Sequence, residues 1–213
     1  MRNVPIVFSS RLFSFLVIGF IVATTVGVLS HEGGHYLAAR YYGFAEVHMR
    51  YNSTSWQCTH SPCNAATERQ HITITAAGPL QTILAGTLGI VLLFTSRNRF
   101  KRKAELNLPQ WCCVFLALFW LREISNLLRE FYLLNFTTGH NFSGDEFLLS
   151  SYFGWGPWLL SVLLGVLAVF ILFAIIFVFV PARQRFTFML SGLFGGVAGA
   201  VLWLGILGPR LMP

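Results

Sequence analysis

The sequence predicts an all-α protein, a polytopic bundle of about five transmembrane helices. Composition is the first reason: 55% of the 213 residues are hydrophobic and only 11% are charged, whereas a soluble domain has about 25% charged residues. The second is spacing, because apolar runs recur along the chain at about the 20 residues that one helix needs to cross a bilayer. We therefore expect residues 1–213 to form a single membrane-embedded domain in contact with the lipid bilayer.

The first apolar run lies between Arg11 and His31 and contains no ionisable side chain. As a helix rising about 1.5 Å per residue, it is long enough for one hydrocarbon core. A cleaved signal peptide is the rival interpretation. Signal cores are shorter, about 7–15 residues, and cleavage near the end of this run would leave the next residues, HEGGH, at a loose new terminus. We expect a retained helix with this motif at its end.

A polar segment, residues 44–71, follows and is rich in Asn, Ser, Thr and His. This composition predicts a loop or small hairpin outside the hydrocarbon. Within it, Cys58 and Cys63 would form a disulfide if the segment faces an oxidising compartment. The alternative is a metal pair completed by His60, although the spacing matches no familiar zinc module.

Four further apolar runs complete the bundle, the last of them rich in glycine. They are expected at about residues 72–94, from Pro109 onward, at 158–180 and at 186–207. The pairs Gly192/Gly196 and Gly195/Gly199 have the small-xxx-small spacing that lets helices approach closely.

The net charge of +7 comes from basic residues in short loops between apolar runs, which argues against a nucleic-acid partner. Cytoplasmic loops are enriched in Lys and Arg, so we expect a cytoplasmic N-terminus. That orientation places nine basic residues inside: Arg2, Arg11, Arg97, Arg99, Lys101, Arg102, Lys103, Arg183 and Arg185. It places four outside: Arg40, Arg50, Arg69 and Arg210.

An HExxH motif, His31-Glu32-Gly33-Gly34-His35, closes the first apolar run. Residues four apart share a helix face, so His31 and His35 can turn imidazole nitrogens toward one zinc ion. Glu32 can then act as general base on the metal-bound water. Two His and one Glu at the end of a transmembrane helix are expensive in lipid and indicate a functional site.

A catalytic zinc site needs a third protein ligand and an open position for water. The only aspartate of the chain, Asp145, lies just before the fourth run, on the same predicted membrane side as His35. Glu146, His140 and Glu123 are rival candidates. The alternative role for Asp145 is to cap the fourth helix, which is common for Asp.

The third helix carries Arg122, Asn126 and Arg129 at spacings that place them on one face. One interpretation is an interfacial helix end with self-paired charges. The other is that Asn126 or an Arg lines the catalytic cavity and stabilises a developing oxyanion.

Three motifs together resemble the site-2 protease family of intramembrane zinc metalloproteases: HEGGH closing an apolar helix, AAGPL opening the next, and GD before a later helix. The resemblance covers roughly residues 20–150. It implies a zinc metalloprotease with His31, His35 and Asp145 as zinc ligands and Glu32 as catalytic base.

The chain departs from that family at two motifs. Gly78-Pro79 matches the family's Gly-Pro pair, but Leu80, Gln81 and Thr82 stand where an Asn is usual. The Asp motif reads GDE where the family has LDG. The family's site also lies toward the cytosolic leaflet, whereas the charge count places HEGGH on the outer side.

The function expected from these residues is hydrolysis of peptide bonds in membrane-associated polypeptides, with Zn²⁺ as cofactor and Glu32 as general base. Two alternatives remain: a divergent membrane scaffold or binding protein that retains the fold, and a metal-ion transporter. Glu32 discriminates among them, because a transit or scaffold site has no need of a carboxylate beside the first histidine.

Overall fold

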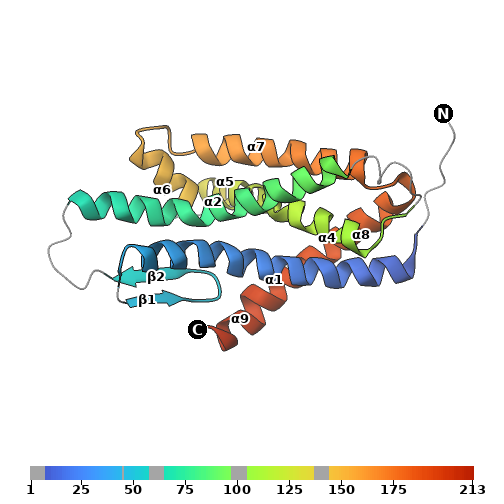
Figure 1. The fold of residues 1–213 in the computed structure, drawn as a ribbon, viewed down its shortest axis with the longest axis horizontal. Helices are drawn as coiled ribbons and strands as arrows, with labels where there is room; N and C mark the ends of the chain where they lie inside the picture. Colours follow the sequence, from blue (N-terminus) through green and yellow to red (C-terminus); the bar gives the residue numbers. More distant parts are fainter. Residues whose placement is uncertain (1–7, 45, 58–64, 97–104, 137–143) are drawn as a thin grey trace.

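The computed structural model describes residues 8–44, 46–57, 65–96, 105–136 and 144–213. Within these residues, five helices are long and apolar enough to cross a membrane, which confirms the predicted all-α bundle. The spans are Ser10–Tyr41, Glu68–Thr95, Leu108–Phe136, Leu159–Phe179 and Ala182–Leu211. We call the end at which α1, α4 and α8 begin the basal end, and the opposite end, which carries a β-hairpin, the hairpin end (Figure 1).

Helix α1, Ser10–Tyr41, begins where Ser9 accepts a hydrogen bond from the Leu12 N–H. Its end is set by Gly43, which has a φ of 80°. The Gly43 and Phe44 N–H groups close a Schellman motif on the preceding turn. The expectation that HEGGH closes this helix was wrong, since no helix-breaking residue follows the motif until Gly43.

The polar segment forms a hairpin of β1 (Glu46–Met49) and β2 (Thr54–Gln57), paired antiparallel. The prediction of a loop throughout 44–71 was wrong in its last part, because α2 (Ala65–Thr95) begins there. Glu68 in its first turn suits the positive end of the helix dipole. The predicted Cys58–Cys63 disulfide and the alternative metal pair with His60 lie outside the described residues.

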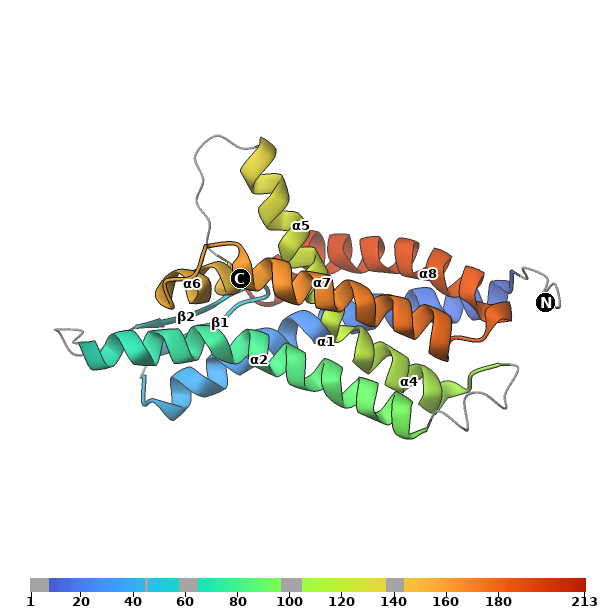
Figure 2. The same ribbon diagram turned by 90° about the horizontal axis from the view of Figure 1, so that it is seen from above.

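The third span joins three pieces: α4 (Leu108–Ala117), a 3₁₀ turn η1 (Leu118–Trp120) and α5 (Leu121–Phe136). A capping box between Asn107 and Gln110 starts α4. Helix α5 leans away from the other helices (Figure 2).

A short helix, α6 (Asp145–Tyr152), precedes the fourth span, and the chain turns at Gly154, whose φ is 67°. The alternative role of Asp145 as the cap of the fourth span is therefore wrong. Asp145 instead begins α6, where Gly144 is the N-cap residue.

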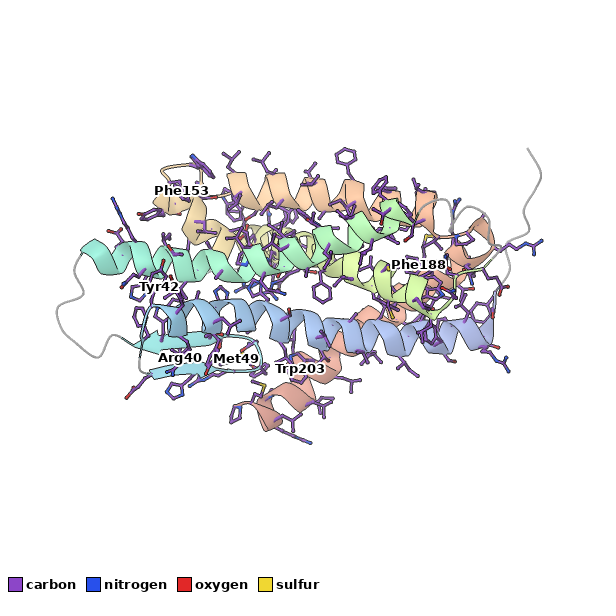
Figure 3. The ribbon with its side chains drawn as sticks, in the orientation of Figure 1. Arg40, Tyr42, Met49, Phe153, Phe188 and Trp203 are labelled. Carbon is purple, nitrogen blue, oxygen red and sulfur yellow. The ribbon has the colours of Figure 1, made fainter. Side chains whose placement is uncertain are left out.

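The last two spans each contain a π-helical stretch, and the C-terminus returns to the hairpin. They comprise α7 (Leu159–Ala174), η2 (Ile175–Phe179), α8 (Ala182–Ala200), η3 (Val201–Leu207) and α9 (Gly208–Leu211). The Trp203 Nε1–H donates to the Tyr51 carbonyl at 3.0 Å, which ties η3 to the hairpin (Figure 3).

Helix α1 packs between α2 and α8. A Cβ at Gly195 would lie 2.8 Å from the Val17 carbonyl oxygen, and one at Gly199 would lie 2.9 Å from Thr24 Oγ1. This pair therefore allows the close approach that its spacing predicts. Gly196 faces open space instead.

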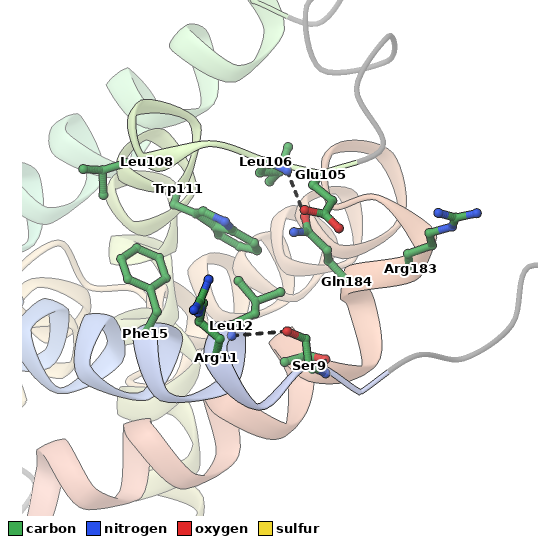
Figure 4. A pocket seen from close by; sticks show the side chains of 11 residues that line it. Ser9, Arg11, Leu12, Phe15, Glu105, Leu106, Leu108, Trp111, Arg183 and Gln184 are labelled. Carbon is green, nitrogen blue, oxygen red and sulfur yellow. Dashed lines mark hydrogen bonds between the residues drawn. The ribbon is translucent and has the colours of Figure 1, made fainter.

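The main apolar core lies in the basal half of the bundle. Its largest buried side chains come from α1, α4, η2 and α8: Leu16, Phe20, Trp111, Ile175, Phe179 and Phe188. A cavity of about 510 Å³ opens beside this core at the basal end, with Arg11 and Arg183 on its walls (Figure 4).

Candidate metal centre

Three side chains from two distant segments converge near the hairpin end. His31 and His35 come from α1 and Asp145 from the first turn of α6. Asp145 Oδ2 lies 3.0 Å from His31 Nε2 and 3.3 Å from His35 Nε2, and the two Nε2 atoms are 3.1 Å apart. In the part of the chain that the structure describes, these are the residues whose side chains are grouped closely enough to hold a metal ion.

The spacing and chemistry of this group fit a zinc ion. Four tetrahedral ligands at about 2.0–2.1 Å from zinc are about 3.3 Å from one another, close to the separations seen here. Two imidazoles and one carboxylate leave the fourth position open for water, as in catalytic zinc sites. Burial acts to raise the pKa of Asp145, but hydrogen bonds with His31 and His35 outweigh it and hold this pKa well below its ordinary value. Asp145 is therefore an anion, as a metal ligand must be.

Hydrogen bonds on the far side of each imidazole set its tautomer. The His35 Nδ1–H donates to the Ile74 carbonyl at 2.8 Å. The Thr82 hydroxyl donates to the Gly78 carbonyl at 3.2 Å, so its oxygen is left to accept from His31 Nδ1–H at 3.0 Å. With a metal ion bound, both rings would thus keep a proton on Nδ1 and turn a bare Nε2 to the shared point, the arrangement by which proteins orient metal-binding histidines.

The Gly-Pro pair in α2 makes room for these rings. A Cβ at Gly78 would overlap His35 Nε2 and lie 2.7 Å from His31 Nε2. Pro79 lies inside the helix and has no N–H, so it cannot donate a hydrogen bond to the carbonyl one turn earlier. At Gly34 a Cβ would lie 2.6 Å from the Ala77 carbonyl oxygen, so α1 and α2 are in backbone contact here.

Glu32 lies beside this group without joining it. Its side chain is buried, and its Oε2 accepts a hydrogen bond from the Thr54 hydroxyl at 3.0 Å. Its Oε1 lies 4.0 Å from Arg122 Nη2, a long contact. The hairpin thus holds one oxygen of the Glu32 carboxylate through Thr54, and the other oxygen faces Arg122 of α5.

The hairpin lies against His35. The Trp56 ring stacks on His35 with the ring centroids 6.4 Å apart and the planes 24° apart. Its Nε1–H donates to His71 Nδ1 at 2.6 Å, which anchors β2 to the first turns of α2.

The rival third ligands occupy other positions. Glu146 is buried and accepts a hydrogen bond from Asn126 Nδ2 at 2.9 Å. Burial, then the negative charge of Asp145, raises the pKa of Glu146. Glu123 is also buried, and its carboxyl lies beside that of Glu146. His140 lies outside the described residues.

The polar face of the third helix lines a cavity beside the site. Arg122, Asn126 and Arg129 all lie on the wall of this space of about 680 Å³. Within the described part of α5, Arg129 interacts electrostatically with Glu130 and Arg122 with Glu123, as the interpretation of self-paired charges expects, although neither pair comes within 4.0 Å. The cavity-lining interpretation also agrees with the geometry.

Sequence reasoning missed the groups that hold the site. Thr82 follows Gly78 by four residues, so helical spacing alone could have placed both against the same imidazole. Thr54 and Trp56 had no comparable signal, because the hairpin reaches the site only through its packing on α1.

Comparison with known proteins places most of this architecture in one family. The model of the family described as Peptidase M50B-like matches residues 11–142, more than half of the chain. The match includes the HExxH motif and the Gly-Pro pair but ends before Asp145. No curated protein and no solved structure matches the chain. The match agrees with the resemblance to site-2 proteases, and with its five apolar helices the chain is a multi-pass membrane protein of the Peptidase M50B-like family.

Proposed function

We propose that this protein is a zinc metalloendopeptidase that hydrolyses peptide bonds of membrane-associated polypeptides. The observation that carries the proposal is the convergence of His31, His35 and Asp145 at metal-ligand separations, with the Glu32 carboxylate buried beside them. Membership of a peptidase family supports the same reaction class.

His31, His35 and Asp145 would hold the zinc ion, which lowers the pKa of a bound water to about 7 and polarises a scissile carbonyl. Glu32 takes the proton of the attacking water and passes it to the leaving amine. Thr54 holds Glu32 Oε2 in place, and the Arg122 guanidinium supplies positive charge where negative charge develops.

The burial of Glu32 favours an enzyme over the two alternatives. An ionisable carboxylate that binds no metal is costly inside a membrane protein, and general-base catalysis gives it a reason to be there. A scaffold would retain the metal without cleavage, and a transporter would move the ion across the bilayer.

The arrangement in the membrane is part of the proposal. Residues 1–213 form one membrane-embedded unit whose N-terminus is cytoplasmic, supported by the excess of basic residues on that side. Labelling of single cysteines from outside the cell tests it. Modification near residue 100 with protection near residue 50 would reverse the orientation.

Metal analysis and a cleavage assay on the same purified samples test the function. Wild type is expected to contain one zinc per chain and to cleave a membrane-tethered polypeptide. His35→Ala and Asp145→Ala should lose both properties, because each removes a ligand. The matched control is His48→Ala, since His48 is exposed on β1.

Undiminished zinc in both ligand variants would contradict the metal site. Zinc binding by wild type without cleavage of any polypeptide would favour the scaffold. Zinc uptake into sealed vesicles that contain the protein would favour the transporter.

A further inference from the structure

The cavity of about 510 Å³ at the basal end lies at the opposite end of α1 from the metal centre (Figure 4). Its walls come from the first two turns of α1, α4 and α8 and from the residues just before α1 and α4. The N-terminus of a helix carries about half a positive charge, and three such ends meet here. Side-chain caps occupy the starts of α1 and α4, whereas α8 has none. The cavity therefore has a positive potential.

Arginine side chains add to this potential. Arg11 points into the cavity, and Arg183 extends outward at its rim (Figure 4). Among the described residues that line the cavity, Glu105 is the acidic one, and no ion pair joins it to either arginine. Two guanidinium groups and three helix ends thus outweigh one carboxylate, which favours an anionic occupant.

A buried amide donor indicates the same kind of occupant. Gln184 is only 6% exposed, and its Oε1 accepts a hydrogen bond from the Leu106 N–H at 3.0 Å. That bond fixes the orientation of the amide, so its Nε2 is turned into the cavity (Figure 4). The Nε2 group makes no hydrogen bond to a described residue. A buried donor without an acceptor costs free energy, and an anionic oxygen in the cavity would remove that cost.

The apolar part of the wall reaches the surface that faces lipid. Phe15 and Leu108 are exposed on two of the membrane spans, and the Trp111 ring forms the inner wall. A ligand that fits this cavity carries an anionic group at one end and apolar chains at the other. Phospholipids have this form, and a guanidinium fork matches the oxygens of a phosphate.

We propose that the basal cavity binds the phosphate group of an anionic phospholipid. Arg11 and the Gln184 Nε2–H₂ group donate to the phosphate oxygens, Arg183 adds positive charge at the rim, and the acyl chains lie along Phe15 and Leu108. Basic pockets between transmembrane helices bind lipid headgroups in this way. The proposal does not rest on the peptidase function, because none of these residues belongs to the metal centre.

Native mass spectrometry of the full chain in detergent, with added lipid, tests the site. Wild type is expected to bind one phosphatidylglycerol per chain and to prefer it to phosphatidylcholine, whose choline cation would meet the positive wall. Arg11→Gln should weaken phosphatidylglycerol binding about 10- to 100-fold, the range for a hydrogen bond to a charged group.

Two further variants separate the cavity from the overall charge of the protein. Gln184→Glu retains the acceptor for the Leu106 N–H but places a negative charge against the phosphate, so it should weaken binding at least as much as Arg11→Gln. Arg210→Gln is the matched control, since it removes one exposed positive charge in α9, and it should leave the affinity unchanged. Equal weakening by Arg11→Gln and Arg210→Gln would overturn the site, and so would equal affinities for the two lipids.

Competition with sn-glycerol 3-phosphate distinguishes a lipid from a soluble phosphate ester. This compound has the phosphate but no acyl chains, so it should displace phosphatidylglycerol only weakly. If it binds as tightly as the lipid, and Arg11→Gln weakens it equally, the lipid assignment is overturned. Zinc per chain, measured on the same samples, should be the same in all variants, because the cavity lies at the other end of α1.

Discussion

The two halves of α1 bury different kinds of side chain. The basal half buries Leu16 and Phe20 in an apolar core. The other half buries His31, Glu32 and His35, and each of these has a defined polar partner. An apolar contact depends mainly on volume, and similar side chains can replace one another in it. Burying a polar group costs free energy unless its particular hydrogen-bond partner is present. The difference predicts that small changes near the hairpin end will alter chemistry, whereas changes in the basal half will alter stability alone.

The largest expected effect is that of Glu32→Gln. The substitution retains size and hydrogen bonding but removes the base, so cleavage should fall by about 10²- to 10⁴-fold, and zinc content should be unchanged. The measurements are a peptide-cleavage rate and metal analysis of the same sample. Glu46→Gln, at an exposed position of β1, is the control. Wild-type cleavage by a zinc-loaded Glu32→Gln protein would contradict the mechanism.

Gly78→Ala tests whether the metal centre tolerates one added methyl group. The added carbon would overlap His35 Nε2, so the imidazoles must move apart. We expect zinc affinity to fall about 10- to 100-fold, the cost of a strained repacking, as measured by competition with a chromogenic chelator. Gly196→Ala should leave affinity unchanged, because that position faces open space. Equal affinities for the two variants would show that Gly78 does not limit the approach of the histidines.

Thr82→Val removes the oxygen that accepts from His31 Nδ1–H and retains the shape of the side chain. Loss of such an outer partner typically costs 10- to 100-fold in metal affinity, and we expect about the lower figure. Thr82→Ser should restore it, since the hydroxyl returns. Thr95→Val, at an exposed position of the same helix, is the control. Unchanged zinc affinity in Thr82→Val would indicate that His31 is oriented by Asp145 alone.

The smallest effect on the metal centre is expected from Leu16→Ala. Leu16 is fully buried, so truncation should destabilise the fold by about 2–5 kcal/mol, measured as a lower thermal midpoint in detergent. Zinc per chain in the folded fraction should not change. Ile18→Ala, on the exposed face of the same helix, should affect neither quantity. Loss of zinc from folded Leu16→Ala would show that the two halves of α1 are coupled.

Many features of the molecule could be predicted from local sequence. Each span is recognisable because it is a continuous run of apolar residues. The HExxH spacing places both imidazoles on one helix face, independently of the rest of the fold. The two wrong boundaries, the end of α1 and the start of α2, both lie in polar sequence. In both places the helix extends beyond the apolar run, and Gly43 rather than the HExxH motif terminates α1.

The sequence by itself determined the five-span bundle, the histidine pair and the carboxylate beside it. Only the tertiary structure decided that Asp145 meets the histidine pair, 114 residues after His31, whereas Glu123 and Glu146 do not. It also decided that Thr54 of the hairpin holds Glu32 and that Arg129 faces an apolar cavity. The physical reason is that these contacts depend on how α5, α6 and the hairpin pack on α1. Several acidic residues have a similar local sequence context, and only this packing determines which of them lies beside the histidines.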